Sequence, residues 1–155
     1  MSGKAEGTLV ASKPLSYQGE LIEDFSITFK DGKAVSVEAK KGKALLEQMI
    51  SMDEGAAKLG ECALIPYDSP IRNTEILFWN TLFDENAACH FALGAGFPEC
   101  YPGGLEMSHE ELTAAGVNDS MIHVDFMIGT RDLSIVGIDA KGKRTQIFKD
   151  GNWAF

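Results

Sequence analysis

Alternating apolar and polar residues predict a β-hairpin early in the chain. Residues 25–29 alternate strictly, and residues 34–37 resume the same period of two. The Asp31-Gly32 pair between them is a typical hairpin turn. A second hairpin is predicted near the C-terminus, where residues 133–136 and 145–148 are joined by a Lys-Gly-Lys turn.

Between the hairpins the apolar spacing changes from a period of two to helical spacing and back. Residues 43–59 carry apolar side chains at helical spacing, which predicts one or two helices. Gly60 ends this pattern, and residues 61–65 are predicted to form a buried strand that Pro66 closes. Residues 86–93 are predicted as a helical segment inside a long irregular region.

A short helix and an apolar strand follow. Ser108 and Glu111 have the spacing of a capping box, which predicts a helix that ends near Gly116. Residues 121–128 then form a strongly apolar strand. The predicted fold class is α+β, with a mixed sheet, β-hairpins and a few helices in a single compact domain, because 155 residues suffice for one core.

Composition narrows the classes of partner. The net charge of −9, with no cluster of lysine or arginine, argues against nucleic acid. No apolar stretch is long enough to span a membrane, so no membrane partner is expected. Cys62, Cys89 and Cys100 form an odd set without CxxC spacing, which favours a reducing compartment and therefore a cytoplasmic protein.

The most informative chemistry is a His-x-Asp pair on the predicted strand at 121–128. Side chains two apart on a strand share one face, so His123 and Asp125 lie about 6–7 Å apart at their bases. The pair can bind one metal ion or two adjacent ions. A satisfied buried hydrogen-bonded pair is the structural alternative.

Other candidate residues are ambiguous when taken singly. Glu61 lies at the start of an apolar strand, where burial of a carboxylate costs free energy unless an ion, a donor or water compensates it. His90 lies in the predicted helical segment, which follows the acidic residues Asp84 and Glu85. His109 lies in a polar first helical turn and is expected to be a solvated surface residue. A Cys89–His90 nucleophile is disfavoured, because neighbours on a helix point in different directions.

Several segments together resemble one known family, the thermophilic metalloaminopeptidases of the aminopeptidase T, aminopeptidase S and PepS type. The resemblance covers nearly the whole chain from about Gly7 onward. The matching segments are Lys13-Pro14-Leu15-Ser16-Tyr17-Gln18-Gly19, residues 60–66, residues 80–90, residues 116–129 and the closing Gly151-Asn152-Trp153-Ala154-Phe155.

The resemblance implies a metal site and a reaction. Glu61, His90, His123 and Asp125 fall on positions that bind a pair of divalent ions in the family, which would be zinc, cobalt or magnesium. Such a site would hydrolyse the first peptide bond of short peptides, and a homodimer is implied. Residues 1–155 would then be the C-terminal metal-binding catalytic domain of an aminopeptidase whose N-terminal domain the chain does not contain.

Two departures from the family pattern bear on activity. Family members carry a further glutamate ligand upstream of the matched region. They also usually carry a tyrosine seven residues after the histidine matched by His90, where this chain has Phe97, whose ring neither ligates nor donates a proton. Tyr101 lies four residues further on and is the candidate catalytic substitute.

Three hypotheses therefore remain. The leading hypothesis is a catalytic domain of a dinuclear aminopeptidase. The second is a catalytically inactive fragment or interaction module that retains the fold, which the Phe97 position favours. The third is a mononuclear iron oxygenase, because His-x-Asp with one distant histidine matches its ligand types; no jelly-roll series of strands accompanies them, so it ranks last.

Overall fold

The computed structural model describes residues 4–155, and its first sheet contains the predicted N-terminal hairpin. The sheet is formed by β1 (Gly7–Val10), β2 (Leu15–Tyr17), β3 (Glu20–Lys30) and β4 (Lys33–Lys41), with β3 paired to the other three strands. Both turn residues between β3 and β4 have positive φ angles, of 51° and 79°, as a tight hairpin turn requires. The hairpin prediction is confirmed, with longer strands than the alternation indicated.

The helical prediction for residues 43–59 is correct only for its first half. Helix α1 (Lys43–Ile50) ends where Asp53 begins a turn. The Asp53 carboxylate accepts hydrogen bonds from the N–H of Ala56 at 2.8 Å and from the N–H of Met121 at 2.8 Å. These bonds tie the turn to the segment before β7, so tertiary contacts rather than helical spacing decide the conformation here.

A second sheet carries the candidate site. Its strands are β5 (Leu59–Ala63), β6 (His90–Gly94) and β7 (His123–Met127), arranged antiparallel in the order β5-β6-β7. The strands predicted around residues 61–65 and 121–128 are therefore confirmed. The central strand β6 was not predicted.

The prediction of a helical segment over residues 86–93 is wrong. Only η1 (Glu85–Ala87) is helical, as a single 3₁₀ turn, and Ala88 is fully extended with φ −164° and ψ 168°. The segment contains three alanines and a leucine, which favour a helix, but β6 hydrogen-bonds to a strand on each side. Long-range sheet pairing therefore overrides the local preference.

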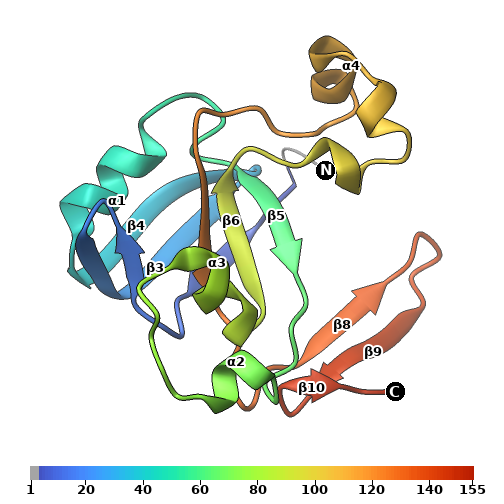
Figure 1. Ribbon diagram of the computed structural model, residues 1–155. Coiled ribbons are helices and arrows are strands. Elements are labelled where there is room, and N and C mark those ends of the chain that lie inside the picture. The colour runs from blue at the N-terminus through green and yellow to red at the C-terminus, as the bar shows by residue number, and fades with distance from the viewer. Residues whose placement is uncertain (1–3) are drawn as a thin grey trace.

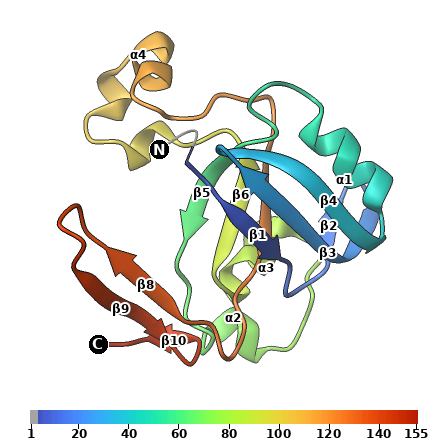
Figure 2. The ribbon, with the colours of Figure 1, turned by 180° about the vertical axis from the view of Figure 1, so that it is seen from behind.

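The two sheets pack against each other through an apolar core. Figure 2 shows β1, β3 and β4 in front of β5 and β6. Phe25 of the first sheet and Phe126 of the second are each 1% exposed, and their ring centroids are 5.8 Å apart. Leu93 and Val124 are buried in the same cluster. Each of these side chains contributes about 1.5–3 kcal/mol of burial free energy.

Short helices fill the connections. Helix α4 (His109–Ala114) begins with the predicted capping box. Ser108 Oγ accepts a hydrogen bond from the N–H of Glu111 at 3.3 Å, and the Glu111 carboxylate accepts one from the N–H of Ser108 at 2.7 Å. That prediction is confirmed. The remaining short helices are α2 (Pro70–Asn73), α3 (Thr81–Asp84), η2 (Pro98–Cys100) and η3 (Gly104–Glu106).

The C-terminal arm, residues 135–155, projects from the body (Figure 1). It contains β8 (Ile135–Ile138), β9 (Arg144–Lys149) and β10 (Asn152–Trp153), and β8 pairs with β9 as the predicted second hairpin. Across residues 4–155, the structure contains no helix with the length and apolar character needed to cross a bilayer. Separate sheets and short helices confirm the α+β class, but the sheets of residues 4–155 are antiparallel rather than mixed, because short connections join most of the paired strands.

Candidate metal centre

One face of the second sheet carries all four residues that the sequence singled out as metal ligands. Glu61 of β5 pairs with Ala92 of β6, and Ala92 pairs in turn with Asp125 of β7. Directly paired residues project from the same face, as do residues two apart on one strand. His90 and His123 therefore share this face with the carboxylates, and only the small Ala92 side chain lies between Glu61 and Asp125.

The Glu61 carboxylate lies between the two imidazoles. Its Oε1 atom is 3.5 Å from His90 Nε2, and its Oε2 atom is 3.3 Å from His123 Nε2. His123 Nε2 is also 3.4 Å from Asp125 Oδ1. The structure thus brings the four residues into one cluster, whereas their role as ligands stays a prediction.

Backbone carbonyls fix the orientation of both imidazoles. His90 Nδ1 lies 3.1 Å from the carbonyl oxygen of Ala88, and His123 Nδ1 lies 2.7 Å from that of Ala95. Because a carbonyl only accepts, each Nδ1 carries a hydrogen, and when the ring is neutral it is Nε2 that presents a lone pair to the cluster. This second hydrogen bond is the usual arrangement of a metal-binding histidine.

Glu85 is a further member of the cluster that the sequence analysis missed. Ligand atoms of Glu85, His90 and Asp125 lie within 4.8 Å of one another, as do those of Glu61, His123 and Asp125. Asp125 therefore belongs to both groups. The sequence signal was the acidic pair 84–85 before His90, but the two carboxylates have different roles in the structure.

The neighbouring carboxylate, Asp84, stabilises a loop instead. It is 5% exposed and accepts the N–H of Phe78 at 2.8 Å and the N–H of Asn80 at 3.1 Å. Both its oxygens are therefore occupied by the backbone at the start of α3. Only Glu85 is left to face the cluster.

The cluster contains three carboxyl groups, and its hydrogen bonds do not satisfy all of their oxygens. Asp125 Oδ1 is buried and accepts no well-formed hydrogen bond among the described residues; its contact with His123 Nε2 is long, at 3.4 Å. Burial raises the pKa of Glu85, and the nearby charge of Asp125 raises it further. An unpartnered buried carboxylate oxygen beside two more carboxylates and two imidazoles fits a divalent cation.

His123 holds a proton in the metal-free cluster. The hydrogen-bonding contact with Asp125 raises the pKa of His123 to about 9, the carbonyl of Ala95 and the charge of Glu61 also raise it, and burial opposes them. The imidazolium thus occupies the place of a cation between two carboxylates. A metal ion that binds Nε2 must displace this proton.

Phe97 lies beside the cluster, and Tyr101 lines the same pocket as Phe97. The Phe97 ring packs on the His123 imidazole with centroids 4.4 Å apart, and both aromatic residues line a pocket of about 240 Å³. Within residues 4–155, the Tyr101 hydroxyl makes no hydrogen bond, and its catalytic role stays a prediction. His109 is exposed and lies 3.4 Å from Asp119, as expected of a surface residue.

The cysteines have no part in the cluster. All three are free, and Cys89 Sγ contacts the carbonyl of Ile65 at 3.2 Å on the opposite side of the strand from His90. Burial raises the pKa of Cys62 and of Cys89, which disfavours the thiolate. A thiol nucleophile at Cys89 is therefore disfavoured for a second reason.

Asn118 braces the loop that orients His123. Its side-chain Nδ2 group donates to the carbonyl oxygens of Gly55 at 2.9 Å and Gly94 at 2.6 Å. The backbone carbonyl of Asn118 accepts the N–H of Gly96 at 2.8 Å. The bonds flank Ala95, whose carbonyl holds His123. The side chain is nearly fully buried, so it has no water to replace these partners.

The Asn118→Ala variant should lower the free energy of unfolding by about 2–3 kcal/mol, because two buried carbonyls lose their donor. Urea denaturation of the metal-free chain measures the change. Asn73→Ala is the control, because Asn73 makes one exposed side-chain bond to Asp68; its effect should stay within about 0.5 kcal/mol. Equal small effects of both variants would show that the brace is not needed.

Comparison with known proteins places the chain in a family. The family model of the thermophilic metalloproteases (M29) matches residues 2–153. The chain belongs to this family. The resemblance found in the sequence is thereby confirmed.

Relatives within the M29 family are aminopeptidases by name. Aminopeptidase AmpS of Bacillus subtilis (strain 168) is 52% identical over 150 residues, which are 97% of this chain and 37% of that protein. Aminopeptidase 2 of Geobacillus stearothermophilus is 51% identical over 149 residues, 96% of this chain and 36% of that protein. A solved structure of wild-type AmpT from Thermus thermophilus matches with a TM-score of 0.91 and 41% identity, over 99% of this chain and 37% of that chain. This M29 chain thus spans a little over a third of the length of these relatives.

Proposed function

We propose that residues 1–155 form the C-terminal catalytic domain of a dinuclear metalloaminopeptidase. The observation that carries the proposal is the Glu61 carboxylate, whose two oxygens face two different imidazoles at 3.5 and 3.3 Å. A carboxylate placed in this way suits a bridge between two hard cations, each completed by one imidazole. Membership of the M29 family supports the same reading.

The cluster provides ligands for both positions. Asp125 belongs to both groups of converging atoms, so it would be shared, with His123 at one ion and His90 and Glu85 at the other. Glu61 would also be shared, because its two oxygens face both imidazoles. When bound, a pair of divalent ions polarises a peptide carbonyl and lowers the pKa of bound water. Zinc, cobalt and magnesium are the candidates.

The chain's own residues supply orientation and proton transfer. The carbonyls of Ala88 and Ala95 hold the imidazoles in the ligating tautomer. Burial and the neighbouring charge of Asp125 raise the pKa of Glu85, so without a bound cation this carboxyl group holds a proton more readily than an exposed glutamate does. Tyr101 is the candidate proton donor where relatives are expected to use the position of Phe97.

The remaining proposals concern the setting of the reaction. The substrates would be short peptides with a free amino terminus, and the protein would act as a homodimer in the cytoplasm, without nucleic-acid or membrane partners. The three free cysteines fit a reducing compartment. An inactive module that keeps the metal is the second candidate, because Phe97 packs directly on His123.

Metal stoichiometry tests the proposal. The purified chain should retain two Co²⁺ or Zn²⁺ ions after dialysis, and Glu61→Gln should retain at most one, because an amide offers one neutral oxygen instead of a bridging carboxylate. Elemental analysis measures both, and Glu110→Gln, an exposed change on α4, should keep two. One ion or none in the unmodified chain would sink the dinuclear site.

Activity separates the enzyme from the module. Hydrolysis of an amino-acid aminoanilide that requires the added metal, and that disappears in His123→Ala, supports the aminopeptidase. Two bound ions without hydrolysis would favour the inactive module.

A further inference from the structure

A basic pocket contains none of the five cluster side chains, although its lining includes Ala88, whose carbonyl orients His90. The pocket has a volume of about 390 Å³, which is in the range of small-molecule sites. Its polar and charged lining consists of Ser12, Lys13, Tyr67, Arg72, Glu75, Thr130 and Arg131. Three cationic side chains therefore converge on one hollow in a chain whose net charge is −9.

These three cations have no carboxylate partner. Among residues 4–155, every ion pair within 4.0 Å involves other side chains, such as Lys41 with Glu23 and Lys43 with Glu38. Glu75 lines the pocket but pairs with none of its cations. Like charges that share a hollow repel one another, and a bound anion would remove that repulsion.

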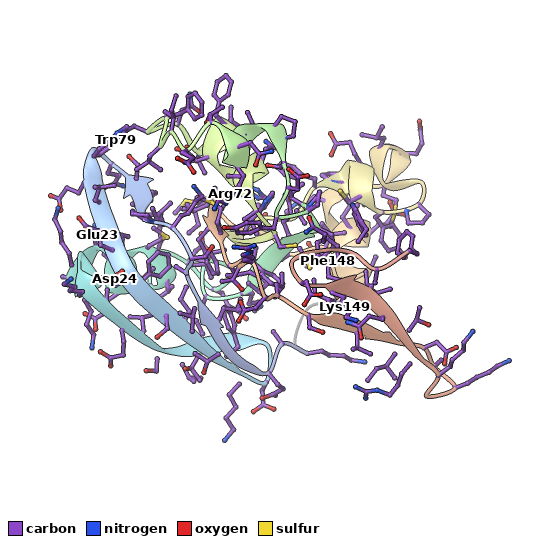
Figure 3. All side chains as sticks on the ribbon, turned by 90° about the horizontal axis from the view of Figure 1, so that it is seen from below. Glu23, Asp24, Arg72, Trp79, Phe148 and Lys149 are labelled. Atoms are coloured by element: carbon purple, nitrogen blue, oxygen red, sulfur yellow. The ribbon has the colours of Figure 1, made fainter. Side chains whose placement is uncertain are left out.

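Arg72 is held in place before any ligand binds. Its guanidinium stacks over the Tyr67 ring, 4.3 Å from the centroid, and its Nη2 group donates to the Tyr67 hydroxyl. The Tyr67 N–H in turn donates to the carbonyl of Gly151 at 2.7 Å. Arg72 is half-buried, and in the view of Figure 3 it lies inside the outline of the molecule, whereas Trp79 lies at the outer edge. A fixed guanidinium loses little side-chain entropy when it binds an anion.

The backbone segments that carry the pocket are also fixed. The Ser69 hydroxyl, which is buried, accepts the N–H of Arg72 at 3.1 Å and donates to the carbonyl of Asn86 at 2.9 Å. The N–H of Ser12, next to Lys13, donates to the carbonyl of Met127 at 2.8 Å at the end of β7. The pocket is thus built between ordered elements.

We propose that this pocket binds a small oxyanion, either a phosphate group or a carboxylate group of a small molecule. The planar guanidinium groups of Arg72 and Arg131 match the paired oxygens of such groups, and Lys13 adds a third charge. The Tyr67 hydroxyl, which accepts from Arg72, keeps its own hydrogen for donation. The alternative is that Arg72 has a structural role only, in which its contacts with Tyr67 are its sole function. The experiment distinguishes the two roles.

Calorimetry on the metal-free chain tests the proposal at constant ionic strength, with inorganic phosphate and with citrate as probes. We expect saturable binding of one anion per chain, and affinity at least about tenfold lower in Arg72→Gln and in Arg131→Gln. Lys149→Gln is the control, because Lys149 lies on the C-terminal arm outside the pocket (Figure 3). The affinity of this variant for the anion should equal that of the unmodified chain. The affinity of Arg72→Lys for the anion should lie between those of the unmodified chain and Arg72→Gln, since lysine keeps the charge but lacks the paired N–H donors of the guanidinium group.

The outcomes are distinguishable. Tighter binding of phosphate identifies a phosphorylated ligand, and tighter binding of citrate identifies a carboxylate ligand; both support the site. Binding that does not saturate at millimolar concentrations, or that Lys149→Gln weakens equally, overturns it, because diffuse attraction would then explain the signal. Circular dichroism establishes that each variant is folded. The assay contains no divalent metal, so its result is independent of the proposed peptidase activity.

Discussion

Replacement of Ala92 by valine is expected to abolish tight binding of divalent ions while the chain stays folded. Ala92 pairs with Glu61 on one side and Asp125 on the other, so its methyl group sits in the middle of the row. Two added methyl groups would occupy the room where the carboxylates and a cation meet. Affinity should fall at least about 100-fold, as measured by competition with a chromogenic chelator.

The fold should survive this change. Valine favours strands, and overpacking at one fully buried position costs about 1–3 kcal/mol. Ala92→Ser keeps the size and should keep the affinity. Ala56→Val adds the same volume at another fully buried alanine, in the core cluster, and should also bind metal normally. Normal affinity in folded Ala92→Val would mean that the ions lie elsewhere on this face.

Part of the candidate metal centre could be predicted from local sequence alone. His123 and Asp125 share a face because the strand period is two, and that period holds wherever the strand pairs. Neither Glu61 nor His90 was assignable in this way. Their contact with the pair depends on which strands become neighbours, and the family resemblance supplied what spacing did not.

The strand β6 shows why local reasoning failed there. Its sequence has the composition of a helix, but with His90 and Ala92 toward the cluster and Phe91 and Leu93 on the other side it also fits a two-sided strand. β6 pairs with β5 on one edge and with β7 on the other, and no short-range sequence pattern indicates the stabilisation that this pairing provides. The two hairpins were predictable because their turns lie between the paired strands.

Glu85 was missed for a related reason. Adjacent carboxylates at 84 and 85 look equivalent in the sequence, yet one accepts two backbone N–H groups and the other faces the cluster. The difference arises from how α3 meets η1, which is a property of the tertiary structure. A resemblance to a family transfers known positions and does not by itself reveal an additional one.

The pH dependence of metal binding should report the proton on His123. In the metal-free chain its pKa is raised to about 9, so at neutral pH the imidazole is protonated and Nε2 is blocked. Metal binding must release this proton, so apparent affinity should rise by up to about tenfold per pH unit as pH increases toward 9. Calorimetric titration in buffers of different ionisation enthalpy counts the proton directly.

The same proton makes the stability of the metal-free chain fall as pH rises. A folded pKa above the ordinary value of 6.5 means that the imidazolium stabilises the fold fully below pH 6.5, and this contribution is lost through pH 9. Metal-loaded chain should not show that loss, because the cation replaces the proton between Glu61 and Asp125. NMR titration of the His123 ring, with exposed His109→Gln as the control, measures the pKa itself. A midpoint near 6.5 would contradict the account, since the two carboxylates would then not hold the proton, and the cluster would have less attraction for a cation than its geometry indicates.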